Sequence, residues 1–157
     1  MIDMDIEGLR TDLSQIDDVD FVVGVPTEAI ALAEAELQVL FPPSYKAFLQ
    51  EFGSGYVSSE GIVGLGGPKH NDVVWLTKEL RGRSSNPLPC NLIPLRNDGF
   101  GNYDCIDVSK GDANGEYQIV EHLHEGKSGE NRKLADNFLD WFREILQMVR
   151  HVDSQND

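Results

Sequence analysis

Apolar residues recur at helical spacing in several segments of the chain. Near the N-terminus, Ile6, Leu9 and Leu13 follow one another at intervals of three and four residues, as the buried face of a helix requires. The same spacing returns later, most clearly in a stripe that runs from Leu134 to Val149. The helices that we expect cover residues 5–16, 27–41, 44–52, 71–81 and this last stripe.

Polar residues, prolines and glycines bound the predicted helices. Thr27 is the expected N-cap of the second helix, and the prolines at positions 42 and 43 end that helix because proline cannot continue one. Gly53 follows the third helix as its C-cap. Asn71 or Asp72 caps the fourth. The helical segments therefore have the boundaries that isolated helices need.

The middle of the chain has the short β-prone runs and turn residues of a sheet. We expect strands at residues 56–58, 62–65, 92–95, 103–108 and 117–122, with a loop over 82–91 and turns over 98–102 and 110–116. Helices at both chain ends around a run of antiparallel strands predict the α+β class. We expect one domain over residues 1–150 and a disordered C-terminal tail over residues 151–157, which are polar.

The charge changes the picture of what this domain can bind. The sequence has 13 Lys and Arg against 27 Asp and Glu, a formal net charge of −14. Such a surface repels nucleic acid and anionic membrane, so we expect neither as a partner. Two interpretations stay open: the acids attract a basic partner, or they serve solubility. No signal peptide and no membrane-spanning run is visible, which predicts a cytoplasmic protein with reduced thiols.

The segment Asp98-Gly-Phe-Gly-Asn102 has the glycines of a phosphate-binding loop. Such a loop needs a helix N-terminus after it and usually a lysine, whereas this segment leads into a predicted strand and carries acids that repel phosphate. We therefore interpret it as a turn in which the glycines adopt positive φ and Asp98 and Asn102 cap the backbone.

Two further residue patterns raise the question of catalysis. His122 and His124 are two residues apart on a predicted strand and so share a face, which would suit a metal ligand pair in a small hydrolase. No third histidine lies at a ligand spacing, and an exposed strand end explains the pair equally. Cys105 lies inside a predicted strand, as a buried apolar residue does. We expect no catalytic residue, no metal site and no cofactor.

The stretch from Asp98 to Glu125 holds seven acids and one base. If its strands form one sheet region, several carboxylates share a face that could steer a basic protein, or that face is merely solvated. An exposed Phe100 at the turn tip would anchor an interface, and the alternative is that it folds back onto the sheet. The candidate partner-binding residues are Asp98, Phe100, Asp104, Asp107, Glu121 and Glu125.

Four blocks in order resemble the SUKH superfamily, and most closely its Smi/Knr cell-wall-assembly-regulator branch. They are residues 41–49 (FPPSYKAFL), 97–107 (NDGFGNYDCID), 121–125 (EHLHE) and 134–142 (LADNFLDWF). The sequence departs from the pattern at Phe41, where leucine is usual, and at His122, where an aromatic residue is common.

The resemblance implies a curved central sheet with helices packed on it and a protein-binding module without catalysis. In bacteria it implies most often an immunity protein, which binds and neutralises a co-encoded polymorphic toxin, frequently a nuclease. The acidity is compatible with such a basic partner. A regulatory or scaffold module of the cell-wall-regulator type is the alternative, and the oligomeric state is left open.

Overall fold

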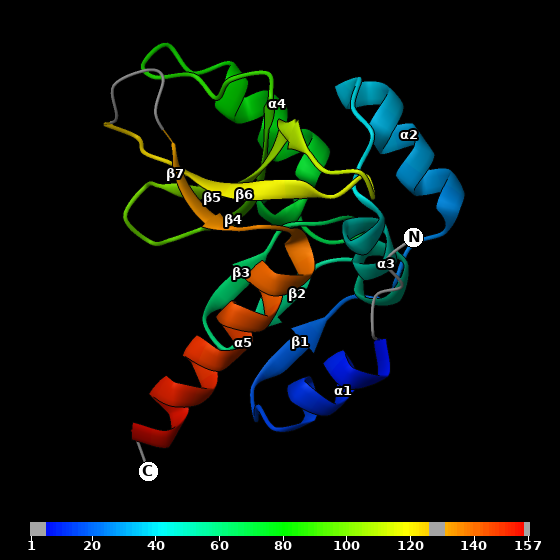
Figure 1. Ribbon diagram of the computed structural model, residues 1–157, viewed down its shortest axis with the longest axis vertical. Coiled ribbons are helices and arrows are strands. Elements are labelled where there is room, and N and C mark those ends of the chain that lie inside the picture. The colour runs from blue at the N-terminus through cyan, green and yellow to red at the C-terminus, as the bar shows by residue number, and fades with distance from the viewer. Residues whose placement is uncertain (1–5, 126–130, 156–157) are drawn as a thin grey trace.

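The computed structural model describes residues 6–125 and 131–155 of the chain. Within them, helices stand at both ends of the described chain and most of the strands lie together between them, as expected for an α+β protein (Figure 1). The helices are α1 (Ile6–Ser14), α2 (Thr27–Leu37), α3 (Pro43–Phe52), α4 (Val73–Arg81) and α5 (Phe138–Gln155), with a 3-10 turn η1 (Lys69–Asn71) before α4. The strands are β1 (Val19–Phe21), β2 (Gly55–Val57), β3 (Glu60–Ile62), β4 (Leu92–Asn97), β5 (Tyr103–Gly111), β6 (Tyr117–His122) and β7 (Arg132–Ala135).

The strands divide between two antiparallel sheets. One has the order β1-β2-β3 and the other β4-β5-β6-β7. A backbone hydrogen bond from Val63 N to Leu95 O, 2.8 Å long, joins the end of the first sheet to the second. The predicted α+β class and the antiparallel strands are thus confirmed, and β1, which we had not predicted as a strand, joins the small sheet.

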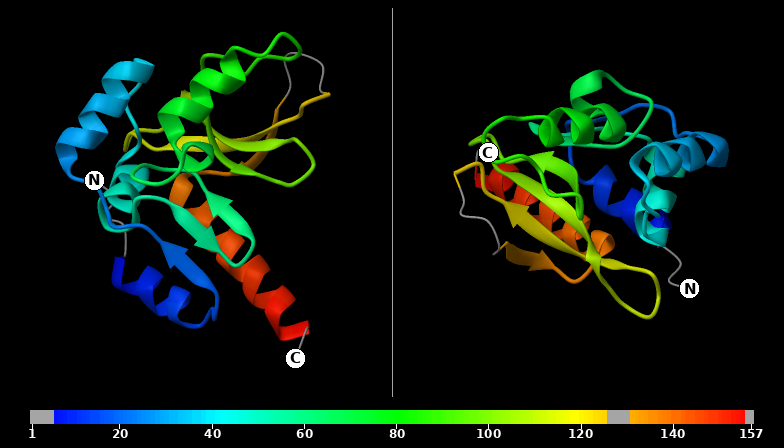
Figure 2. Two further views of the ribbon diagram at one scale, coloured as in Figure 1. Left: turned by 180° about the vertical axis from the view of Figure 1, so that it is seen from behind. Right: turned by 90° about the horizontal axis from the view of Figure 1, so that it is seen from above.

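Helices α4 and α5 lie on opposite sides of the four-stranded sheet (Figures 1 and 2). A cluster of aromatic rings joins α5 to α3: Phe48 packs against Phe138 and Phe142 with ring centroids 5.4 Å apart in each pair. Because successive residues of a strand point to opposite faces of the sheet, side chains on alternating positions of β5 face α4 and α5 in turn. Tyr103 points toward the α4 side, and its neighbour Asp104 points toward α5.

The structure shortens the second predicted helix. α2 ends at Leu37, because Gln38 adopts a left-handed conformation with φ 56°. The carboxylate of Glu34 then accepts a hydrogen bond from Phe41 N at 2.7 Å, which turns Phe41 back into the core. The N-cap prediction was also wrong, since Pro26 occupies that position and Thr27 is the first helical residue.

The C-terminal helix begins later and ends later than the sequence predicted. Leu134 lies in β7, a strand that we had not predicted because its apolar residues continue the helical spacing. Helix α5 begins at Phe138, and Asn137 before it accepts a hydrogen bond at Oδ1 from Asp140 N at 2.9 Å. Residues 151–155, expected in a disordered tail, continue α5. A hydrogen bond between the His151 and Gln155 side chains spans the last turn.

Candidate functional site

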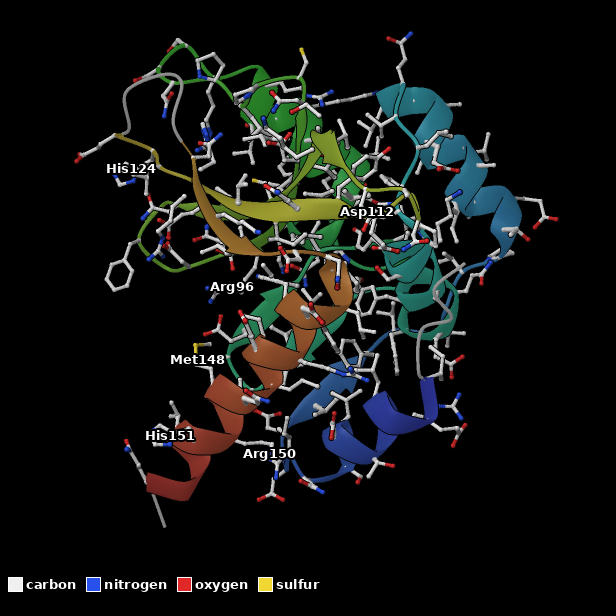
Figure 3. All side chains as sticks on the ribbon, in the orientation of Figure 1. Arg96, Asp112, His124, Met148, Arg150 and His151 are labelled. Atoms are coloured by element: carbon white, nitrogen blue, oxygen red, sulfur yellow. The ribbon has the colours of Figure 1, made fainter. Side chains whose placement is uncertain are left out.

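Four charged residues form a cross-strand row on the α5 side of the larger sheet. The strand registers pair Arg96 with Asp104, Asp104 with Glu121, and Glu121 with Arg132. Directly opposed residues on one face lie close enough to interact, so the row reads plus, minus, minus, plus across the sheet, with a basic residue at each end and two acids in the middle. Arg96 lies between this sheet and α5 (Figure 3). We name this row the charge ladder.

Asp104, at the centre of the charge ladder, is 3% exposed. Its Oδ2 accepts hydrogen bonds from Arg96 Nε and Trp141 Nε1, each 3.0 Å long. Arg96 also donates to Glu60 Oε2 at 2.6 Å. Burial by itself would lower the pKa of Arg96, but the two carboxylates raise it above its usual value. The predicted contact residue Asp104 is therefore an internal tie between the sheet and α5.

Asp107 and Glu121 are also engaged within the molecule. Asp107 is buried, and its Oδ1 accepts from Asn91 Nδ2, Ser109 N and Ser109 Oγ at 2.6–3.0 Å. Glu121 is largely buried and lies 3.4 Å from Arg132. The expectation that these acids form one accessible face with Asp104 is therefore corrected for the two buried aspartates, because hydrogen-bond donors in the fold take up their carboxylates.

Asp98 organises the turn between β4 and β5 as expected. Its Oδ1 accepts from Phe100 N at 2.8 Å and from Asn102 N at 3.1 Å, and its Oδ2 accepts from the Asn102 side chain. Slight burial would raise the pKa of Asp98, but these hydrogen bonds and the charge of Arg96 lower it. Gly99 and Gly101 have φ 91° and 92°, so both glycines supply the positive φ that the turn needs.

Phe100 stands at the tip of this turn with 80% of its surface exposed. The alternative that it folds back onto the sheet is therefore wrong. The turn is tied to the next loop, because Asn102 Oδ1 accepts from His124 N at 3.1 Å and contacts His124 Nδ1 at 2.9 Å. Leu123, partly exposed, and Glu125, largely exposed, flank His124 in that loop.

A third loop joins the first two. Asn86 Nδ2 donates to the carbonyl oxygens of Leu123 and His124 at 2.6 and 3.2 Å. We name the surface formed by Asp98, Phe100, Leu123, His124 and Glu125 the tip surface; His124 marks it in Figure 3. No local pattern marks Asn86 or Leu123 in the sequence, because their roles depend on loops that meet only after folding.

His122 and His124 raise the question of a metal site in the described part of the chain. No group of three or more His, Cys, Asp and Glu residues there is placed to hold a metal. Burial lowers the pKa of His122, with a backbone interaction with Asn86 opposing part of the shift. Burial raises the pKa of the Cys105 thiol most strongly, and the charges of Asp104 and Asp107 raise it further. The thiol therefore stays protonated, and Cys105 is a packing residue.

Among the described helices, none is long and apolar enough to cross a membrane.

Comparisons with known proteins agree with this architecture. A model of the SMI1 / KNR4 family (SUKH-1) matches residues 24–144, more than half of the chain. A crystal structure of a protein from Pseudomonas syringae pv. tomato superposes with a TM-score of 0.65 at 17% sequence identity, covering 90% of this chain and 98% of that one. At this identity the likeness shows the fold alone. No protein of curated function matches the sequence.

Proposed function

The chain belongs to the SMI1 / KNR4 family (SUKH-1), and from that premise we propose that it is a non-enzymatic protein-binding module that acts as an immunity protein. Its partner is the basic toxin domain of a neighbouring gene, which it neutralises by covering the toxin's active surface. The contact is made by the tip surface, with Phe100 as its anchor.

The exposure of Phe100 carries this proposal. A phenylalanine with 80% of its surface in water buries little apolar surface, so it contributes little to the stability of the free protein. Five hydrogen bonds involving Asp98, Asn102 and His124 hold the turn beneath it, so little conformational freedom is lost when a partner covers the ring. Exposed aromatic anchors on rigid supports are typical of the residues that dominate interface energies.

Charge supports a basic partner. The net charge of −14 attracts cationic proteins over long range. Asp98 lies in the turn that carries Phe100, and Glu125 follows His124, which is hydrogen-bonded to that turn. Asp104 and Asp107 add to the overall field but make no direct contact, because they are buried. Association should therefore slow as salt is added, while the apolar contact of Phe100 persists.

The proposal is tested by matched substitutions. Phe100→Ala is compared with Leu32→Ala, which removes a similarly exposed apolar side chain from α2. The wild type and the two variants are each used to capture partners from the native cell, and the captured proteins are identified by mass spectrometry. We expect one basic protein that the wild type and Leu32→Ala capture equally and that Phe100→Ala loses. Equal capture by all three proteins would show that Phe100 is not part of the interface.

Growth separates immunity from a scaffold role. The captured protein is expressed in cells with and without this chain. If the partner is a toxin, growth arrest is relieved by the wild type and by Leu32→Ala but not by Phe100→Ala. A partner that leaves growth unaffected when expressed alone would instead favour the regulatory or scaffold module.

A further inference from the structure

A cavity of about 470 Å³ lies over strands β5, β6 and β7 of the larger sheet, and this volume is within the range of about 300–1,000 Å³ that is usual for ligand pockets. Val120 of β6, in its lining, is opposed to Cys105 of β5 and to Lys133 of β7. Cys105 lies two residues after Tyr103 and so shares the face that points toward α4. The cavity and the charge ladder are therefore on opposite faces of the sheet.

The lining of this cavity is polar. Among the described residues that form it, Val120 is the one apolar side chain, and Asn91, Gln118 and Asn131 contribute amides. Polar groups that lose water need hydrogen bonds in return, so an apolar ligand would be costly to place here. A ligand that fills the cavity must carry donors and acceptors of its own.

Asp107 supplies a buried negative charge to the same lining. It is 6% exposed, and all three hydrogen bonds that its carboxylate accepts from Asn91 and Ser109 end on Oδ1. Oδ2 accepts none from a described residue, and it is not among the described atoms that are both unpaired and closed off from solvent. A small cation that enters the cavity can therefore reach Oδ2, although Asp107 lies too deep for the surface of a protein partner.

The charge of Asp107 has no counterpart in the described part of the chain. No described residue forms an ion pair with it, whereas buried charges are usually paired. Asp107 is also the one acid that lines the cavity, and a single carboxylate is a poor metal site. It suits an ammonium group, which binds a carboxylate through a charge-assisted hydrogen bond.

Two lysines give the cavity a positive side. Lys133 is paired with Asp136, whereas Lys110 is exposed and forms no ion pair with a described residue. A ligand that carries only a positive charge gains from Asp107 but is repelled by the lysines, and a purely negative ligand meets the reverse. A ligand with both charges gains both attractions, so the lining favours a dipolar molecule.

We propose that this cavity binds a free amino acid with an uncharged polar side chain. Its α-ammonium group donates to Asp107 Oδ2, and its α-carboxylate faces Lys110. Its side chain meets the amides of Gln118 and Asn131, which form no side-chain hydrogen bond with a described residue. Binding here is independent of the partner of the tip surface and can be measured without one.

The probe is L-glutamine, and two analogues that keep its side-chain amide each lack one charge. The cationic 4-aminobutanamide has no carboxylate, and the anionic 4-carbamoylbutanoate has no ammonium group. Affinities are measured by isothermal titration calorimetry. The NMR signals of the Asn91 and Gln118 side-chain amides, both in the lining, locate the binding.

We expect L-glutamine to bind most tightly and to shift both amide signals. Asp107→Asn keeps an acceptor for Asn91 and Ser109, so it should preserve the fold. It should weaken glutamine binding about 10–100-fold, the value of a hydrogen bond to a charged group. The affinity for 4-carbamoylbutanoate should not fall, because that analogue has no ammonium group to lose. If Asp107→Asn does not fold, the two analogues and the wild type decide the matter.

Lysine substitutions test the other end of the ligand. Lys110→Met should weaken glutamine binding about 2–5-fold, as expected for an exposed ion pair. Lys69→Met removes an equally exposed lysine from η1, outside the cavity, and should leave the affinity unchanged. The affinity for 4-aminobutanamide should not fall in Lys110→Met, since that analogue has no carboxylate.

Absence of glutamine binding, or equal binding of the three compounds, would overturn the proposal. So would binding that Asp107→Asn leaves unchanged, or that leaves the Asn91 and Gln118 amide signals unmoved. None of these results touches the comparison of Phe100→Ala with Leu32→Ala, so failure of the cavity and failure of the tip surface remain distinguishable.

Discussion

Glu116, which precedes β6, caps helix α3 through Ser44. The Glu116 carboxylate accepts from Ser44 N at 2.9 Å and from Ser44 Oγ at 2.6 Å, and both residues are buried. Pro42, at the N-cap position of α3, provides no side-chain hydrogen bond. A carboxylate from 72 residues further along the chain thus satisfies a backbone donor at the positive end of the α3 dipole.

Glu116→Ala should lower the free energy of unfolding by about 2–3 kcal/mol, because it leaves the Ser44 amide and hydroxyl buried without an acceptor. Glu116→Gln keeps one oxygen and should lose less. Urea denaturation measures both, with the exposed Glu28→Ala in α2 as a control that should stay near wild type. Equal stability of Glu116→Ala and Glu28→Ala would contradict the capping role.

Asp104→Ala should cost about 3–5 kcal/mol, since it leaves the Arg96 charge without its buried partner and Trp141 Nε1 without an acceptor. Arg132→Ala removes the exposed end of the charge ladder and should cost less than about 1 kcal/mol. Urea denaturation midpoints of the two variants, compared with wild type, give the ordering. A reversed order would show that the ladder stabilises the sheet at its edge.

Asp98 makes stability depend on acid pH. Its pKa in the folded protein lies below 3.8, the ordinary value of an aspartate side chain in an unfolded chain. The stabilisation it gives is therefore fully present above that value and is lost as the pH falls through the lower, folded pKa. Asp98→Asn keeps an acceptor oxygen but has no charge to titrate. The stability gap between wild type and Asp98→Asn should shrink when urea denaturation is repeated at pH values below 3.8, and a gap that is constant with pH would contradict this.

Gly101→Ala should destabilise the protein more than Gly99→Ala. Both positions have positive φ, which costs an L-residue about 1–2 kcal/mol. A Cβ at Gly101 would also lie 3.2 Å from His124 Nδ1, whereas a Cβ at Gly99 would meet nothing within 4 Å. Thermal unfolding compares the two variants, and the His124 ring signals in NMR should shift more in Gly101→Ala. Equal effects on both measurements would mean that His124 adjusts freely.

Local features of the sequence predicted much of the fold. The apolar stripes located all five described helices, Gly53 was confirmed as the C-cap of α3, and Asp98 was confirmed as a capping residue of the turn. The Asn102 side chain instead bonds His124 in the next loop. These features depend on neighbours within about one helical turn or one tight turn. The helix ends were less predictable, because Gln38 and Asn137 end or begin helices through contacts that apolar spacing does not encode.

The candidate site divides in the same way. The acids from Asp98 to Glu125 are visible in the sequence, but their exposure is not. Asp104 is buried because Trp141 and Arg96 meet it from α5 and β4, while none of the described residues covers Phe100, which keeps 80% of its surface exposed.

By itself the sequence determined the α+β class, the positions of the helices, the acidity and the turn chemistry, all set by composition and by contacts between near neighbours. Only the tertiary structure decided which acids are internal ties and which aromatic ring is exposed. Burial and hydrogen-bond pairing depend on residues brought together from distant parts of the chain, as Ser44 and Glu116 are.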